Sequence, residues 1–216
     1  MKVIIFGATG MVGRGVLREC LADGRVESVL AVGRSPTRVD HPKLRDLRHD
    51  DLLDLAPIEE RLAGFDACFF CLGVSSAGMS EKDYRRITYD CTMAVARTLS
   101  RLNPGSAFVY VSGAGTDAHG RAMWARVKGE TENALLALPL EAYMFRPGYI
   151  HPMHGVTSRT RLYRLAYMVT RPLYPVLRVM FPSAVTTTKR IGQAMITVAE
   201  RGAPKRILGP ADINAL

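Results

Sequence analysis

Apolar residues along the chain fall into short continuous runs that alternate with segments of helical periodicity. The first run covers residues 3–6 and is followed by a glycine-rich turn. Over residues 11–23, apolar side chains such as Val12, Val16 and Leu17 then recur on one side of a helix. A short, wholly apolar run is typical of a strand that is buried on both faces of a parallel sheet. Residues 1–40 therefore predict a strand, a helix and a second strand.

The same alternation continues to the end of the chain, with no repeat or linker that would divide it. Strands are predicted at residues 28–32, 44–48, 67–72, 107–111, 142–146 and 205–208, and helices at 57–63, 81–102, 121–138 and 188–201. Strands in alternation with helices predict an α/β fold, a Rossmann-type doubly wound parallel sheet covered by helices on both faces. The pattern favours one domain over residues 1–216.

Residues 151–184 differ in character from the rest of the chain. Four prolines interrupt a basic stretch there that is rich in Tyr and Leu. We interpret this stretch as a small C-terminal helical lobe, an elaboration on the substrate side of the domain.

Three glycines, Gly7, Gly10 and Gly13, directly follow the first predicted strand and open the first helix. The first permits a tight turn, the second lets the backbone approach a pyrophosphate at the positive end of the helix, and the third lets the helix pack closely on the sheet. This pattern predicts a dinucleotide site, and the alternative is a tight turn with no ligand. The cofactor contacts expected from the loop are Gly7, Thr9, Gly10, Met11, Val12 and Gly13.

The end of the second predicted strand indicates which dinucleotide is preferred. An acidic residue there would bind the ribose 2′-hydroxyl of NAD, whereas an arginine accommodates the 2′-phosphate of NADP. The chain has no acid at this point but has Arg34, a planar bidentate donor, followed by Ser35. We therefore expect NADP(H) to be preferred over NAD(H), the alternative being that Arg34 is a solvated surface side chain.

Several further motifs occur in an order that resembles a known family. They are GATGMVG at residues 7–13, VGRS at 32–35, HDDL at 49–52, FCLG at 70–73, YVS at 110–112, VKGE at 127–130 and FRPG at 145–148. Over nearly its whole length the chain resembles the atypical short-chain dehydrogenases/reductases. VKGE followed by FRPGYI is similar to the narrower group around the Tat-interacting-protein oxidoreductase.

This resemblance implies cofactor contacts at the ends of later strands. They are Asp51 and Leu52 at the adenine, Cys71, Leu72 and Gly73 beside the nicotinamide-side ribose, and Pro147 and Gly148 near the nicotinamide. The alternative for Asp51 is a turn or helix N-cap residue. Cys68 and Cys71 stand three apart in a predicted strand and so face opposite sides of the sheet, which argues against a shared disulfide or metal site.

The resemblance also implies a catalytic set of Ser, Tyr and Lys, with the last two as Tyr-x-x-x-Lys on one helix face. Ser112 and Lys128 occupy the expected positions, but Trp124 stands where the family has Tyr. Indole N–H is a hydrogen-bond donor without acid–base chemistry near neutral pH. Ser112 and Lys128 are then explicable as cofactor contacts. The residues that could supply an acid instead are Tyr149, His119, His151 and His154, and no metal site is expected from them.

The positive charge of the chain is concentrated in one segment and limits its possible partners. The net charge is +9, yet no acidic residue occurs from 142 to 199, so the excess lies in one late segment. Residues 159–181 combine five arginines with apolar residues at helical spacing. They predict a lobe packed on the sheet, a segment on an anionic membrane surface, or a site for an acidic ligand; nucleic-acid binding is not expected because no reader motif accompanies the charge.

Four cysteines in apolar stretches indicate a reduced protein, and no apolar run approaches the roughly 18 residues needed to span a bilayer. The five-residue apolar run near the N-terminus is too short for a signal peptide. We therefore expect a cytoplasmic location.

Together these features predict an NADP(H)-binding, oxidoreductase-like protein of the atypical short-chain group that acts on a small molecule. Because Trp124 replaces the expected Tyr, a non-catalytic NADP(H)-sensing or scaffold protein is the main alternative. A nucleotide-sugar epimerase-like isomerase is a third.

Overall fold

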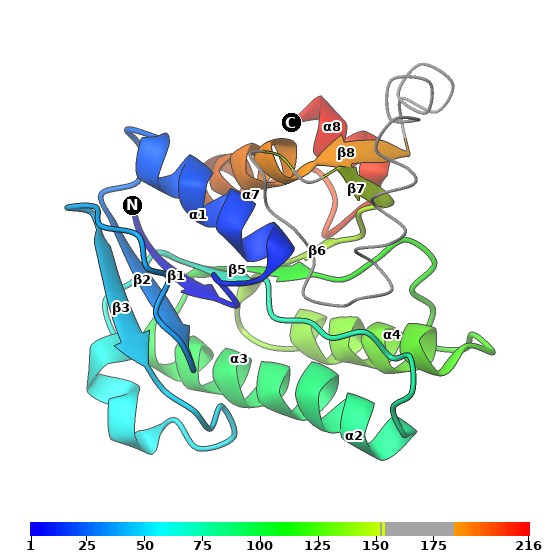
Figure 1. The fold of residues 1–216 in the computed structure, drawn as a ribbon. Helices are drawn as coiled ribbons and strands as arrows, with labels where there is room; N and C mark the ends of the chain where they lie inside the picture. The colour runs from blue at the N-terminus through cyan, green and yellow to red at the C-terminus, as the bar shows by residue number, and fades with distance from the viewer. Residues whose placement is uncertain (152, 154–183) are drawn as a thin grey trace.

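Seven parallel strands form the central sheet of the computed structural model, which describes residues 1–151, 153 and 184–216 (Figure 1). The strands lie in the order β3-β2-β1-β4-β5-β6-β9. Their bounds are β1 Lys2–Phe6, β2 Ser28–Gly33, β3 Leu44–Arg48, β4 Ala67–Phe70, β5 Ala107–Val111, β6 Glu141–Phe145 and β9 Ile207–Leu208. A separate parallel pair is formed by β7 Tyr149–His151 and β8 Val185–Thr187.

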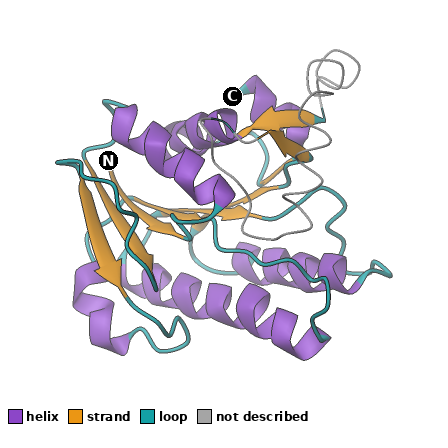
Figure 2. Cartoon of the chain, in the orientation of Figure 1, coloured by secondary structure: helices purple, strands orange, loops and turns teal. Residues whose placement is uncertain are grey.

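Helices cover both faces of the sheet (Figures 1 and 2). One face carries α1 Met11–Ala22 and α7 Thr188–Arg201, and the other carries α3 Cys91–Leu102 and α4 Met123–Leu136. The remaining helical segments are the 3₁₀ helix η1 Ala56–Leu62, α2 Glu81–Arg85, the π-helical turn η2 Arg86–Asp90 and α8 Pro210–Ala215. The predicted Rossmann-type doubly wound sheet is therefore confirmed.

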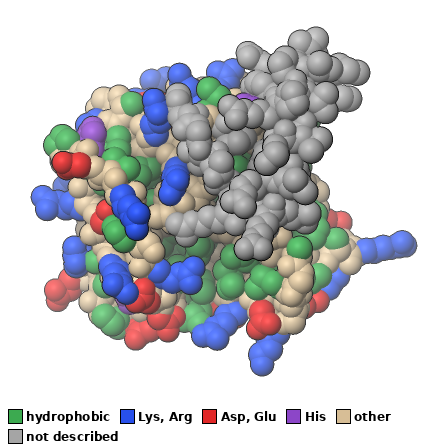
Figure 3. Space-filling view, in the orientation of Figure 1, with side chains coloured by type: hydrophobic (Ala, Val, Ile, Leu, Met, Phe, Trp, Pro, Cys, Tyr) green, Lys and Arg blue, Asp and Glu red, His purple; other side chains and the backbone are tan. Residues whose placement is uncertain are grey.

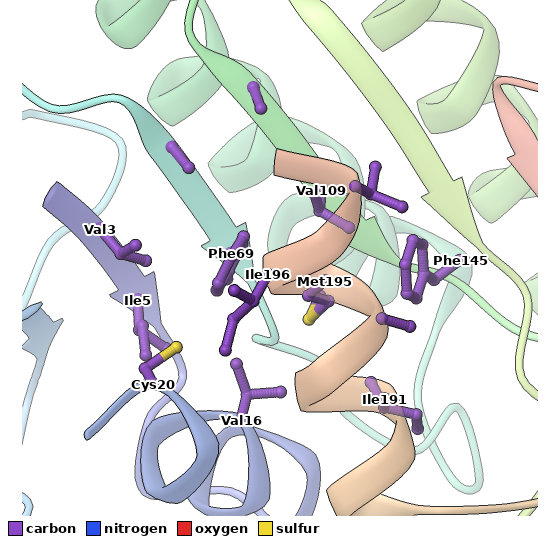
Figure 4. Packing of buried hydrophobic residues seen from close by; sticks show 14 of the residues in the cluster. Val3, Ile5, Val16, Cys20, Phe69, Val109, Phe145, Ile191, Met195 and Ile196 are labelled. Carbon is purple, nitrogen blue, oxygen red and sulfur yellow. The ribbon is translucent and has the colours of Figure 1, made fainter. Parts of the chain in front are cut away.

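Alternate residues of each central strand belong to two separate hydrophobic layers. In β1, Val3 and Ile5 pack with α1 and α7, whereas Ile4 and Phe6 pack with the helices of the opposite face. Figure 4 shows the first layer, with Val16 of α1 and the apolar side chains of α7 directed at the strands. Because both faces are buried, these strands are apolar at every position rather than at every second one.

Most predicted elements are confirmed, with small shifts at their ends. The predicted strand 67–72 ends at Phe70, the strand 142–146 begins at Glu141, and the strand 205–208 is reduced to two residues. β7, β8 and α8 were not predicted, because their three to six residues contain neither a continuous apolar run nor a clear helical period. Most of the proposed lobe at 151–184, including the basic segment 159–181, lies outside the described residues. In the part that is described, no helix is both long and apolar enough to span a bilayer.

The packing of α1 on α7 depends on two glycines that have no side chain to separate the helices. A Cβ built on Gly15 would lie 2.4 Å from Cβ of Thr188, and a Cβ on Gly192 would lie 2.9 Å from Cβ of Glu19. Both distances are shorter than van der Waals contact. The two helices therefore approach each other more closely than alanine would allow.

We expect Gly15→Val to lower the free energy of unfolding by about 1–3 kcal/mol, because the added atoms would overlap the buried Thr188. Urea unfolding measures the change. Gly24→Ala is the control, since no atom lies within 4 Å of the position of its new Cβ. Equal unfolding midpoints for the two variants would contradict the close helix contact.

Candidate functional site

The candidate site lies at the carboxyl edge of the sheet, where the strand order reverses. β1 stands between β2 and β4, so the chain leaves β1 in one direction along the sheet and returns to its other side through β4. Doubly wound sheets bind ligands in the crevice at this point. The glycine loop follows β1 directly and faces this crevice.

The three glycines of the loop meet three different steric requirements. Gly7 has φ of +81°, and a Cβ there would lie 2.7 Å from the backbone nitrogen of Leu72. A Cβ on Gly13 would lie 2.1 Å from the carbonyl oxygen of Gly7, so the helix touches the turn itself. Gly10 differs, because its Cβ would have one close neighbour, the Gly7 oxygen at 3.3 Å. Apart from its chain neighbours, no other described residue comes within 4 Å of that position, which leaves room for the approach of a pyrophosphate.

The N-terminus of α1 suits an anion. Gly10 is the N-cap residue, no side chain caps the helix, and its first turn contains no acidic residue. The first amide groups of a helix have no partner within it, and they carry the positive end of its dipole. The loop and the helix end therefore fit the diphosphate of a dinucleotide.

A cleft with a volume of 770 Å³ opens beside this loop. Ten of the residues predicted to contact the cofactor line it: Gly7, Thr9, Gly10, Arg34, Ser35, Asp51, Leu52, Cys71, Leu72 and Gly73. They come from the ends of β1, β2, β3 and β4, which the parallel sheet brings to one edge. The structure thus gathers into one cavity residues predicted for the adenine, the 2′-phosphate, the pyrophosphate and the nicotinamide-side ribose.

Three arginines line the cleft: Arg34, Arg48 and Arg86. Arg34 is exposed and forms no ion pair with a described residue, whereas Arg48 lies 3.5 Å from Asp50 in an exposed pair. The space-filling view shows Lys and Arg side chains spread over this side of the molecule among fewer acidic ones (Figure 3). Arg34 is therefore free to bind an anionic group on a ligand in the cleft.

Asp51 is both a turn residue and a residue of the cleft. Its Oδ1 accepts a hydrogen bond of 2.9 Å from the backbone N–H of Leu53, which makes it a turn residue. It also lines the cleft with an exposed side chain. The turn accounts for the residue type, and the second carboxylate oxygen stays available to a ligand.

Four of the other predicted residues form a second group near the ends of β5 and β6. They do not line the 770 Å³ cleft, and the group consists of Ser112, Lys128, Pro147 and Gly148. The N–H of Ser112 donates to the Phe145 carbonyl at 2.7 Å, and the N–H of Ala114 donates to that of Pro147 at 2.9 Å. Two backbone hydrogen bonds thus hold the loops after β5 and β6 together.

Met11, Val12 and Gly13, also predicted as cofactor contacts, lie in the first turn of α1 outside the lining of the cleft. Met11 and Val12 are half-buried, and Gly13 is buried against the turn. The backbone N–H groups of these residues nevertheless belong to the N-terminal turn of α1.

The hydroxyl of Ser112 is hydrogen-bonded to Thr116, a residue that the sequence motifs do not indicate. Ser112 Oγ lies 2.9 Å from Oγ1 of Thr116, and the Thr116 hydroxyl donates to the Gly113 carbonyl at 2.8 Å. A hydroxyl has one proton, so Ser112 is the donor to Thr116. Ser112 must turn away from Thr116 before it can donate to a substrate oxygen.

Lys128 directs its ammonium group at the end of β5. Nζ donates to the carbonyls of Ser112 at 3.1 Å and Val111 at 3.4 Å, and it lies 5.6 Å from the centre of the Tyr110 ring. Burial of this group lowers the pKa of Lys128 to about 8, and the negative charge of Glu132 acts in the opposite direction. The charge of Lys128 therefore changes within one to two units of neutral pH.

Trp124 stands one helical turn before Lys128 and covers the loop after Ser112. The tip of its ring, Cη2, lies 3.4 Å from the position that a Cβ on Gly115 would occupy. The side chain is half-buried. The indole thus packs against the loop that follows Ser112.

The other candidate acids are spread over two elements. His119 is exposed in the loop before α4, Tyr149 and His151 are half-buried on β7, and His154 lies outside the described residues.

Several residues of the cleft were not predicted as site residues. Arg86, Ile87 and Cys91 reach it from η2 and the start of α3. The pattern over 81–102 predicts a helix, but nothing in that pattern says which turn of it lies against the end of β4.

Comparison with known proteins places the chain in a family. The model of a family described as NAD(P)H-binding matches residues 7–153, which is more than half of the chain. The chain belongs to this NAD(P)H-binding family. The resemblance to atypical short-chain dehydrogenases/reductases, derived from the motifs alone, is confirmed.

Relatives of this NAD(P)H-binding protein include Protein HTATIP2 of Rattus norvegicus, 25% identical over 153 residues, with 69% of this chain and 62% of the relative covered. Another is Protein FMP52-2, mitochondrial, of Scheffersomyces stipitis, which is 28% identical over 151 residues, with 68% of this chain and 65% of the relative covered. The chain thus spans less than two thirds of the length of these two relatives.

Solved structures share the fold. A short chain dehydrogenase family protein from Francisella tularensis superposes with a TM-score of 0.71 at 13% identity, with 100% of this chain and 99% of that one covered. WbmF of Bordetella bronchiseptica, in complex with NAD+, has a TM-score of 0.69 at 16% identity, with 99% of this chain and 76% of that chain covered. At such identities the likeness shows the fold alone.

The cysteines of the NAD(P)H-binding protein lie as their spacing predicts. Cys68 packs in the layer on the α3 side, whereas Cys71 packs against the layer on the α1 side. Burial raises the pKa of both thiols. Both thiols are therefore protonated near neutral pH, and Cys71 also lines the cleft.

Gly10→Val is expected to abolish binding of NADPH while leaving the protein folded, because its side chain would fill the open space in front of α1. Gly13→Val should instead destabilise the fold, because its Cβ would overlap the Gly7 carbonyl. Calorimetric titration and thermal unfolding of both variants distinguish the two effects. Unchanged titration of a folded Gly10→Val protein would contradict the position assigned to the pyrophosphate.

Proposed function

We propose that the chain is an NADP(H)-preferring, oxidoreductase-like protein of the atypical short-chain group whose catalytic set is altered at Trp124. The observation that carries the cofactor preference is Arg34, which lines the cleft beside Ser35 without an acidic partner. Its guanidinium can donate two parallel hydrogen bonds to a phosphate. An acid at the same position, which would favour NAD, is absent from the sequence.

In this proposal each group of residues has one task. The glycine loop and the end of α1 hold the diphosphate, Arg34 and Ser35 bind the 2′-phosphate, and Lys128 donates to the nicotinamide-side ribose. The nicotinamide ring, when bound, supplies hydride transfer. Ser112 fixes the oxygen of a substrate carbonyl after its hydroxyl has turned away from Thr116.

Trp124 limits the chemistry that this set can perform. Reduction of a carbonyl needs a proton at the oxygen, and an indole cannot give one near neutral pH. We therefore expect tight binding of NADPH with slow reduction of simple aldehydes and ketones.

The second candidate function, a non-catalytic NADP(H) sensor, is favoured by the same indole together with the committed hydroxyl of Ser112. No contact among the described residues favours the third alternative, an epimerase-like isomerase. The cytoplasmic location stays a prediction, since the name of the Scheffersomyces stipitis relative describes that protein as mitochondrial.

Replacing Arg34 by Ala should weaken binding of NADPH about 10- to 150-fold, the loss expected for one charge-assisted hydrogen-bonding contact of roughly 1.5–3 kcal/mol. Binding of NADH should change little, because it lacks the 2′-phosphate. Isothermal titration with both nucleotides measures the difference.

The matched control is Arg45→Ala, which removes an exposed arginine of β3 that does not line the cleft. It should leave both affinities unchanged. Equal affinity of the natural protein for NADPH and NADH would refute the preference.

Trp124→Tyr should raise NADPH-dependent carbonyl reduction at least tenfold, because it introduces a phenol one turn before Lys128 at the position where the related enzymes have their acid. Consumption of NADPH with an aromatic aldehyde provides the assay. Trp124→Phe, which has the same ring without the hydroxyl, should stay at the level of the natural protein. Rapid turnover by the natural protein that survives Trp124→Phe would show that another residue is the acid and would exclude the sensor.

A further inference from the structure

The segment that follows β2 is attached at two points to β3 and the residue after it. At the start of the segment, the N–H of His49 donates to the carbonyl of Gly33 at 3.1 Å. At its end, the carboxylate of Asp46 binds Thr37. The Thr37 N–H is shared between Oδ1 at 3.1 Å and Oδ2 at 3.2 Å, and the Thr37 hydroxyl donates to Oδ2 at 2.9 Å. Residues 34–36 lie between the two attachments.

The backbone of this segment has little freedom of its own. The ring of Pro36 fixes its φ angle. Arg38 has φ of +60°, in the left-handed region, and no other non-glycine residue of the described chain has a positive φ. A conformation of this kind is unfavourable by itself and persists where neighbouring contacts hold it. Those contacts are the Thr37–Asp46 bonds before Arg38 and the bond of 3.4 Å from the Val39 N–H to Thr37 Oγ1 across it.

We propose that Asp46 is a positioning residue that sets the conformation of residues 34–37 before a nucleotide binds, and that it thereby contributes to the preference for a 2′-phosphate. The second half of this statement rests on the proposed function, in which Arg34 and Ser35 bind that phosphate. Both residues line the cleft together with Thr37, whereas Asp46 does not. Asp46 therefore acts through the segment and not on the ligand.

Thr37 serves as the anchor of the segment and not as a phosphate donor. Its hydroxyl has one proton, which is donated to Asp46, and its oxygen accepts from the Val39 N–H. Arg34, in contrast, forms no ion pair with a described residue, so its guanidinium keeps its donors for a ligand. A side chain that is presented on an ordered backbone loses less conformational freedom when it binds.

The charge of Asp46 opposes the effect of its position. A carboxylate that binds Thr37, a residue of the cleft wall, repels a phosphate in the cleft. Removal of the negative charge alone should therefore strengthen the binding of NADPH, whereas loss of the hydrogen bonds should weaken it. Because the two effects have opposite signs, Asp46→Ala and Asp46→Asn can separate them.

The first test measures amide hydrogen exchange by NMR in the ligand-free protein. Asp46→Ala should speed exchange of the Thr37 amide about tenfold, because its acceptor is lost. Asp46→Asn keeps an acceptor oxygen and should retain most of the protection. Asp46 is exposed, so both variants should stay folded. Unchanged exchange at Thr37 in Asp46→Ala would overturn the proposal.

The second test is calorimetric titration with NADPH and NADH. Asp46→Ala should weaken binding of NADPH about three- to tenfold, the range expected when one long side chain has to be ordered during binding, and should change binding of NADH little. Asp46→Asn should bind NADPH at least as tightly as the natural protein. The matched control is Asp66→Ala, which removes an exposed carboxylate that accepts the Lys2 N–H at 2.7 Å at the opposite edge of the sheet. It should leave both affinities unchanged.

A double variant shows whether Asp46 acts through Arg34. In an Arg34→Ala background, Asp46→Ala should have little further effect on NADPH, because no guanidinium is left to position. Equal losses for NADPH and NADH in Asp46→Ala, or the same loss of NADPH in Asp46→Asn, would overturn the proposal. Equal affinity of the natural protein for the two nucleotides would instead refute the proposed preference, and the exchange rates would still decide whether Asp46 holds the segment.

Discussion

The structure depends on one steric constraint, the contact of the first helix with the turn that precedes it. Gly13 of α1 rests against the carbonyl of Gly7, and Gly7 in turn rests against the backbone of Leu72 after β4. No side chain fits at either position. The N-terminus of α1 and the C-terminal ends of β1 and β4 are therefore in direct backbone contact. This contact forms the anion site without any charged side chain.

The cleft and the second group of site residues are built on different principles. The glycine loop relies on close backbone packing, which fixes where a diphosphate can lie. The ends of β5 and β6 rely on buried polar contacts instead: the Ser112–Thr116 hydroxyls, the Lys128 ammonium and an ion pair between Glu132 and Arg146. Substitutions in the glycine loop act through shape, whereas those at the ends of β5 and β6 act through charge and proton position. Trp124, which differs from the Tyr that the family resemblance implies, lies near the second group of site residues.

The fold and the loop could be predicted from the sequence because their signals are local. The run at residues 3–6 and the spacing of Gly7, Gly10 and Gly13 each specify a neighbourhood of a few residues. The partnerships of Ser112 with Thr116 and of Glu132 with Arg146 could not be predicted, because they depend on how a loop turns and on which strand end meets a helix. The π-helical turn at Arg86–Asp90 is a further example, since the pattern over 81–102 predicts a single helix and does not show which of its side chains line the cleft.

The close packing of α1 on α7 has a consequence for synthesis of the chain. These helices are joined through Gly15 and Gly192, yet about 170 residues separate the end of α1 from the start of α7. At 5–20 residues per second, a ribosome needs about 10–30 seconds to produce the intervening chain. During that time the apolar side of α1, with Val16 and Cys20, has no α7 to cover it. The helix that follows the nucleotide loop is therefore fully packed only after residues 188–201 have been synthesised.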